Sequence, residues 1–201
     1  MKIICIGRNY KLHAKELGNK VPKEPIFFLK PDSAILPKRN PFYVPNFSKD
    51  IHYEVELIIK IKKLGKSIQL EFARDYYSEV GLGIDFTARD IQEKCKKLGY
   101  PWEISKAFDQ SAVISEDFIS FKSIDNINFS LKKNGVIVQK DNSNNMIFNP
   151  NQIIHYVSQF MTLKIGDLIF TGTPSGVGPV SIGDKLEGFI DDKKMLTVNI
   201  R

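Results

Sequence analysis

The sequence predicts one mainly β domain with a few helices, and three observations lead to this prediction. Its 201 residues suit one domain with a substantial core, which we assign to residues 1–201. Short runs rich in β-branched and apolar residues recur, as in KIICIG, EVELIIKI and EVGLGIDF. Glycine and proline separate these runs, and no repeat, linker or change in composition divides the chain.

The first half of the chain is expected to alternate strands with short helices. Pro37, Pro41 and Pro45 break the segment from Pro37 to Phe47, which we therefore expect to be an extended loop. The other expected elements are strands over 2–7, 25–30, 51–61 and 79–86, and helices over 10–17 and 70–77.

The second half is expected to contain two longer helices and several strands. A helix is predicted over residues 87–100, with Thr87 as its N-cap and Gly99 as its stop signal. Residues 118–139 alternate as a strand does, and Asn134 with Gly135 marks a hairpin turn. A second amphipathic helix is predicted over 149–163, followed by glycine-punctuated strands and loops within 166–178, 183–190 and 194–200.

Composition and charge argue against several classes of protein. The formal net charge is +6, but the lysines are scattered without interleaved aromatic residues, so we predict no nucleic-acid partner. No apolar run approaches the roughly 20 residues that cross a bilayer, and the N-terminal segment turns polar at Arg8, so we expect neither a membrane partner nor a secretory signal. Two isolated cysteines, Cys5 and Cys95, indicate a reducing compartment and a cytoplasmic protein. We interpret the scattered lysines as a solvated surface that could also attract anionic substrates. They are Lys60, Lys62, Lys63, Lys66, Lys94, Lys96, Lys97, Lys132 and Lys133.

Three carboxylates are candidates for a metal site. Side chains alternate faces along a strand, so Glu54 and Glu56 point the same way, and Asp85 closes the apolar run EVGLGID. Unpaired acids on a strand that favours burial are costly, and a cation would offset that cost. Ligands that are all oxygen favour Mg²⁺ or Mn²⁺ over Zn²⁺. A lone E-x-E is also compatible with an exposed edge strand whose acids face water.

Two further positions suggest acid–base or charge-stabilising chemistry. His13 and Glu16 share one face if their segment is helical, and a carboxylate beside an imidazole raises its basicity as a general base requires. A surface ion pair has the same spacing. Lys106 follows the aromatic stretch YPWEIS and could stabilise negative charge on a substrate, or extend to solvent as a surface lysine.

Two positions could contact a substrate directly. Gln92 lies seven residues after Asp85, in the helix that this acid precedes, and could reach a carboxylate or carbonyl, although a solvated helix glutamine fits too. The loop TGTPSGVGPV lacks the order of a phosphate-binding loop. Thr173 and the backbone N–H groups of this loop could still bind a substrate carboxylate, or the segment could be a simple tight turn.

Seven stretches together resemble the fumarylacetoacetate hydrolase family in its short form, which contains only the catalytic domain. They run in family order over almost the whole chain: GRNYKLHAKELGN, FLKPDSAIL, HYEVELIIKI, GIDFTARDIQ, GYPWEISKAFDQ, NMIFNPNQIIHYVSQFMTL and GDLIFTGTPSGVGPV. The resemblance implies a mixed, multi-sheet β-roll, a divalent metal at the three acids and usually a homodimer. It assigns His13 and Glu16 to a lid that carries a water-activating dyad, and it places Arg8, Gln92, Lys106 and Thr173 around the substrate.

The resemblance also implies the chemistry. We expect Mg²⁺-dependent hydrolysis of acylpyruvates at a C–C bond, with Mn²⁺ able to substitute, and oxaloacetate decarboxylation or keto–enol tautomerisation at the same site. The substrate would be a small 2-oxo acid. Isomerisation of 2-hydroxyhepta-2,4-diene-1,7-dioate is the alternative within the family, and an inactive interaction protein is the alternative outside enzymes. Many relatives have NTSDMIF where this chain has NSNNMIF from Asn142 to Phe148, which leaves substrate contacts of that loop open.

Overall fold

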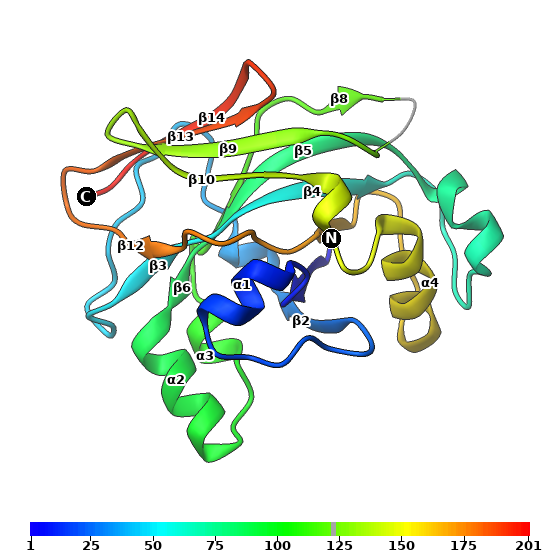
Figure 1. Ribbon diagram of the computed structural model, residues 1–201, viewed down its shortest axis with the longest axis horizontal. Helices are drawn as coiled ribbons and strands as arrows, with labels where there is room; N and C mark the ends of the chain where they lie inside the picture. The colour runs from blue at the N-terminus through cyan, green and yellow to red at the C-terminus, as the bar shows by residue number, and fades with distance from the viewer. Residues whose placement is uncertain (122–123) are drawn as a thin grey trace.

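A computed structural model shows a mainly β molecule built around a seven-stranded sheet (Figure 1). The structure describes residues 1–121 and 124–201. Strand β11 runs parallel to β1 and antiparallel to β4, and therefore joins the N-terminal strands to the rest of the sheet. In spatial order the strands are β2 (Ile26–Lys30), β1 (Ile3–Gly7), β11 (Leu168–Phe170), β4 (Val55–Ile61), β5 (Tyr77–Asp85) and β7 (Ala112–Ile114), with β8 (Ile119–Ser120) also paired to β5.

Two smaller sheets complete the β structure. The four-stranded sheet has the order β10 (Val136–Asn142), β9 (Asn128–Lys133), β13 (Lys185–Ile190) and β14 (Lys193–Asn199). The three-stranded sheet consists of β12 (Gly178–Pro179), β3 (Ile51–Tyr53) and β6 (Thr87–Ala88). Asn134 and Gly135 both have positive φ angles, 53° and 83°, and form the predicted turn between β9 and β10.

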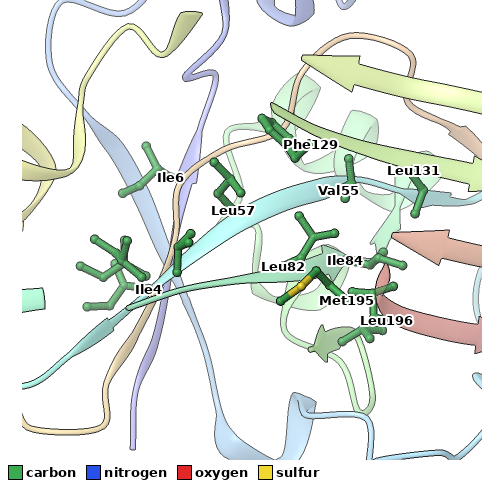
Figure 2. Packing of buried hydrophobic residues seen from close by; sticks show 14 of the residues in the cluster. Ile4, Ile6, Val55, Leu57, Leu82, Ile84, Phe129, Leu131, Met195 and Leu196 are labelled. Carbon is green, nitrogen blue, oxygen red and sulfur yellow. The ribbon is translucent and has the colours of Figure 1, made fainter. Parts of the chain in front are cut away.

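The main hydrophobic core lies between the large sheet and the four-stranded sheet. Figure 2 shows Leu57 and Leu82 of the large sheet facing Phe129 and Met195 of the smaller one. Because side chains alternate along a strand, Glu56 and Ile58 of β4 point to the other face. There Ile58 packs in a second buried cluster with Cys5, Phe28 and Phe170, among others.

The helices divide between two regions of the molecule. Figure 1 shows α1 (Lys11–Glu16), α2 (Arg89–Leu98) and α3 (Glu103–Lys106) on the side of the large sheet away from the four-stranded sheet. The remaining helix, α4 (Pro150–Phe160), packs against the 3₁₀-helix η2 (Leu70–Tyr76). Two single-turn 3₁₀-helices are η1 (Asp32–Ala34) and η3 (Ser143–Asn145).

Most predicted elements are present, with three differences. The segment predicted as a helix over 70–77 is a 3₁₀-helix. Thr87 is not an N-cap: it lies in β6, α2 begins at Arg89, and the cap residue Ala88 makes no side-chain cap bond. The predicted strand over 51–61 is two strands, β3 and β4, which belong to different sheets. The alternating region 118–139 contains β8, β9 and the first part of β10, with the predicted hairpin between the last two; its residues 122–123 lie outside the described residues.

Two other sequence expectations can be compared with the fold. The predicted extended loop from Pro37 to Phe47 contains neither helix nor strand. Gly99 ends α2 in the left-handed conformation, with a φ of 70°, as its stop signal predicted. Within residues 1–121 and 124–201, no helix has the length and apolarity needed to span a membrane.

Candidate active site

Three buried carboxylates meet where β4 begins and β5 ends. Val55 pairs with Ile84, and the amide of Asp85 donates to the carbonyl of Glu54 at 2.9 Å, so the antiparallel register brings the two strand ends together. Glu54, Glu56 and Asp85 are 4%, 2% and 1% exposed. One carboxylate oxygen from each lies within 4.8 Å of the others. The alternative of an exposed edge strand is therefore wrong.

Cationic side chains neutralise two of the three acids. Lys106 Nζ donates to Glu54 Oε2 and Asp85 Oδ2, both at 2.8 Å, and to Thr87 Oγ1 at 2.6 Å. Arg89 donates to Glu54 Oε1. Lys30 Nζ lies 2.8 Å from Asp85 Oδ1, although its N–H groups point to Ser111 and the Lys106 carbonyl. Lys30 consequently interacts with Asp85 Oδ1 through its positive charge, and no described residue donates a hydrogen bond to this oxygen.

Glu56 differs from its neighbours because no cation among the described residues pairs with it. Its Oε2 accepts a hydrogen bond from the Gly172 amide at 2.7 Å. Gly172 has a φ of 100°, and a Cβ there would lie 2.6 Å from the Asn9 Cβ, so this close approach requires glycine. Burial, together with the charges of Asp85 and Glu54, raises the pKa of Glu56 well above its ordinary value.

Ion pairing favours the charged forms of Glu54 and Lys106 and shifts the pKa of each accordingly. Burial alone would raise the pKa of Glu54, but Lys106 and Arg89 outweigh it and hold that pKa well below the ordinary value. Burial likewise opposes the charge of Lys106, yet Asp85 and Glu54 raise the pKa of this ammonium group. Both groups are therefore charged at neutral pH.

The donor set fits a hard divalent cation. Among the residues that the structure describes, none donates a hydrogen bond to the buried Asp85 Oδ1, and none is a counter-ion for Glu56. Three clustered carboxylates with no sulfur or imidazole among them suit Mg²⁺ or Mn²⁺. Lys106 places one positive charge between two of these acids.

Helix α1 places His13 against the same site. His13 is 5% exposed, and its Nδ1 lies 3.2 Å from Glu16 Oε2, as the three-residue spacing predicted. Burial lowers the pKa of His13, although Glu54 and Glu16 oppose the shift. The other oxygen of Glu16 accepts from the Gly176 amide at 3.0 Å, which ties α1 to the loop over residues 171–178.

Thr173 of this loop lines the cavity, but its hydroxyl is engaged inside the protein. The hydroxyl donates to the Val55 carbonyl and accepts from Gln139 Nε2, both at 2.9 Å. Gln139 also accepts from the Val55 amide at 2.9 Å through Oε1. The Thr173 hydroxyl is therefore already paired within the protein on both its donor and its acceptor side.

One face of α2 completes the site. Gln92 is buried, and its Oε1 accepts from Arg89 Nη1 at 2.6 Å, which leaves the amide NH₂ group to donate elsewhere. The spacing of Arg89, Gln92 and Lys96 places all three on this face. Together with Arg8, the carboxylates, His13, Lys106 and Thr173, they line a cavity of about 30 Å³.

Comparison with known proteins identifies the family. Residues 2–201 match the family model described as fumarylacetoacetate (FAA) hydrolase C-terminal. The chain belongs to the fumarylacetoacetate hydrolase family. The predicted fold, a mainly β-roll of this type with a few helices, is therefore confirmed.

Relatives within the family carry several activities in their names. The chain is 48% identical over 190 residues to the mitochondrial oxaloacetate decarboxylase of Dictyostelium discoideum, covering 92% of this chain and 87% of the relative. It is 43% identical over 192 residues to oxaloacetate tautomerase FAHD1, mitochondrial, of Mus musculus, covering 94% and 86%. Fumarylpyruvate hydrolase from Pseudomonas aeruginosa, solved in complex with Mn²⁺ and pyruvate, superposes with a TM-score of 0.92 at 36% identity, covering 100% of this chain and 89% of that one.

All nine residues singled out from the sequence line or adjoin this one cavity. Eight of them line the cavity, and Glu16 contacts His13 beside it. Sequence reasoning missed Lys30, Arg89 and Gln139, whose contacts join segments far apart in the chain. It also assigned Lys96 to the solvated surface, which is wrong, because this lysine is half-buried and lines the cavity. The helical spacing of Arg89, Gln92 and Lys96 was the available signal.

Proposed function

We propose that this protein is a Mg²⁺- or Mn²⁺-dependent enzyme acting on small 2-oxo acids with a carbonyl or carboxylate at the β position. Decarboxylation of oxaloacetate and interconversion of its keto and enol forms are the reactions proposed first, because relatives at 48% and 43% identity are named for them. The observation that carries the proposal is the buried acidic triad, in which Glu56 has no counter-ion within residues 1–121 and 124–201. The triad lines a cavity together with Lys106 and Gln92.

Glu54, Glu56 and Asp85 would hold the ion. A bound Mg²⁺ or Mn²⁺ would supply Lewis-acid polarisation of the 2-oxo group and its neighbouring carboxylate. Lys106 Nζ donates to Glu54 Oε2 and Asp85 Oδ2, so it lies directly beside the carboxylates that would hold the ion and next to any substrate bound there. Lys106 can then stabilise the negative charge that develops on the 2-oxo oxygen.

Acylpyruvate hydrolysis is the second candidate, and the His13–Glu16 pair favours it. Glu16 accepts the Nδ1–H of His13, so Nε2 of the neutral ring is free to take a proton from water or from the substrate C3. Hydrolysis of the C–C bond needs such a base to activate water. The fumarylpyruvate hydrolase that superposes on this chain is named for a reaction of this type.

A metal-dependence assay with a substrate panel tests both candidates. Protein stripped with a chelator should turn over neither oxaloacetate nor acylpyruvates, and Mg²⁺ or Mn²⁺ should restore activity. Including 2-hydroxyhepta-2,4-diene-1,7-dioate in the panel tests the isomerase alternative. Turnover that persists without metal would overturn the metal assignment. Absence of any turnover with metal present would favour an interaction protein instead.

A further inference from the structure

Two cations face the active-site cavity with no acidic partner among the described residues. Arg8 follows β1, and Lys96 lies in the last turn of α2. Both contact the same indole: the Arg8 guanidinium lies 5.7 Å and Lys96 Nζ lies 5.8 Å from the centre of the Trp102 ring. The buried Nε of Arg8 has no hydrogen-bond partner in the part of the chain that the structure describes. One ring therefore contacts both positive groups without neutralising either.

The charge balance of the cavity calls for an anion with more than one charge. Its lining includes four cationic side chains, Arg8, Arg89, Lys96 and Lys106, against the three carboxylates of the triad. Lys30 adds a further positive charge behind Asp85. The triad forms ion pairs with Lys106, Arg89 and Lys30. Arg8 and Lys96 have no acidic partner among the described residues. A divalent ion at the triad would add two more positive charges.

The surroundings of Lys96 do not favour its charged form. Burial, followed by the charges of Arg89 and Arg8, lowers the pKa of Lys96. An anion bound between Arg8 and Lys96 would relieve the repulsion between these cations. The unfavourable pairing thus supports a ligand-binding role better than a structural one.

We propose that Arg8 and Lys96, held on Trp102, form a subsite for the second carboxylate of a dianionic substrate. This inference rests on the proposed function and specifies its substrate class: 2-oxo dicarboxylates such as oxaloacetate, in preference to acylpyruvates with a neutral tail. The metal-proximal 2-oxo carboxylate and the distal carboxylate bind at separate places, and Lys96 selects for the distal one.

Two unreactive ligands that differ only at the distal group test the subsite. Malate and 2-hydroxybutanoate share a 2-hydroxycarboxylate that can chelate a metal, but malate carries a carboxylate where 2-hydroxybutanoate carries a methyl group. Isothermal titration of the Mn²⁺-loaded protein should show tighter binding of malate. In Lys96→Met, and in Arg8→Gln, malate affinity should fall about ten-fold or more, the loss typical of one charged hydrogen bond. Affinity for 2-hydroxybutanoate should change less than about two-fold, because neither variant alters its partners.

Lys97→Met is the matched control, since Lys97 is the exposed neighbour of Lys96 on the same helix. It should bind both ligands as the wild type does. Equal affinity of the wild type for the two ligands, or an unchanged preference in Lys96→Met, would overturn the subsite. Thermal unfolding of each variant checks that the fold is intact.

The outcomes separate this inference from the proposed function. Turnover of oxaloacetate combined with an unchanged ligand preference in Lys96→Met would keep the function and reject the subsite. A Lys96-dependent preference for malate in a protein that turns over no 2-oxo acid would do the reverse. Failure to bind either ligand in the presence of Mn²⁺ would reject both.

Discussion

Glu56 carries the least compensated charge in the site, and this has opposite effects on folding and on metal binding. Its carboxylate is buried beside Glu54 and Asp85, and among the described residues only the Gly172 amide donates to it. The repulsion among these acids destabilises the metal-free protein, whereas the same negative charge attracts a cation.

Replacing this one charge should therefore separate stability from function. We expect Glu56→Gln to raise the melting temperature of the metal-free protein, because the amide can still accept from Gly172 without repelling Asp85. The rise in melting temperature that Mn²⁺ gives the wild type should disappear, and so should essentially all activity. Thermal unfolding with and without Mn²⁺ measures both effects. A variant that still gains stability from Mn²⁺ would show that Glu56 is not a ligand.

His13 should distinguish the two reactions proposed for this site. Hydrolysis needs a base for water, whereas decarboxylation of oxaloacetate needs chiefly an electron sink. His13→Ala should lower acylpyruvate hydrolysis by roughly 10²- to 10⁴-fold, the range that general-base catalysis contributes. Oxaloacetate decarboxylation should fall much less when both rates are measured on the same preparation. Equal losses would mean that His13 moves a proton common to both reactions, as a tautomerase requires.

The lowered pKa of His13 also predicts the pH dependence of hydrolysis. Only the neutral ring can accept a proton, and burial keeps it neutral to lower pH than a free histidine, whose pKa is about 6.5. Activity should be retained as the pH falls to about 6.5 and be lost at lower pH, as it passes through the folded-state value. The acid limb of kcat/KM against pH measures this. A limb centred above about 6.5 would contradict the assignment of His13 as the base.

At the scale of elements, the side chain of Glu16 links α1 to the loop beside the site. Glu16 bonds His13 through one oxygen and the Gly176 amide through the other, so it links the helix to the loop over 171–178. The helix has six residues and no side-chain cap, which makes it marginal on its own. Its position therefore depends on such contacts.

Two substitutions at Glu16 should separate its contact with the Gly176 amide from its effect on catalysis. Glu16→Ala removes both contacts, and hydrogen–deuterium exchange should then become faster in residues 11–17 and at Gly176. Glu16→Gln retains an oxygen for the Gly176 amide but has no charge to support His13. It should keep near-wild-type protection while hydrolysis falls. Equal exchange in all three proteins would show that Glu16 does not hold the helix.

The elements also show where sequence reasoning succeeded and where it could not. The strands that carry Glu56 and Asp85 follow from β-branched, apolar runs, and the hairpin at Asn134 and Gly135 follows from turn chemistry, since both signals are local. The expected N-cap at Thr87 was wrong: the Thr87 hydroxyl instead accepts a hydrogen bond from Lys106, which is distant in the chain. Lys30, Arg89 and Gln139 escaped notice for the same reason, because what defines each is a contact across the fold.

For the molecule as a whole, the interface between the two larger sheets should dominate stability. Leu82 of β5 is fully buried there, facing the four-stranded sheet (Figure 2). Leu82→Ala should lower the free energy of unfolding by about 2–5 kcal/mol, measured by urea denaturation. Ile182→Ala, at a side chain that is 74% exposed, should change it by less than about 0.5 kcal/mol. Similar losses in both would argue against this core.

The homodimer that the family resemblance implies stays a prediction, which sedimentation velocity can test.

The central position of β11 has a consequence for biosynthesis. Leu168 of β11 pairs with Ile3 of β1, and Phe170 of β11 pairs with Ile58 of β4. The large sheet therefore lacks this strand between β1 and β4 until the ribosome has passed residue 170. Before that point the nascent chain exposes the unpaired edges of β1 and β4, which are templates for aggregation. The amide of Gly172 emerges immediately afterwards, so joining the sheet and supplying the hydrogen bond to Glu56 form one late event in the maturation of the protein.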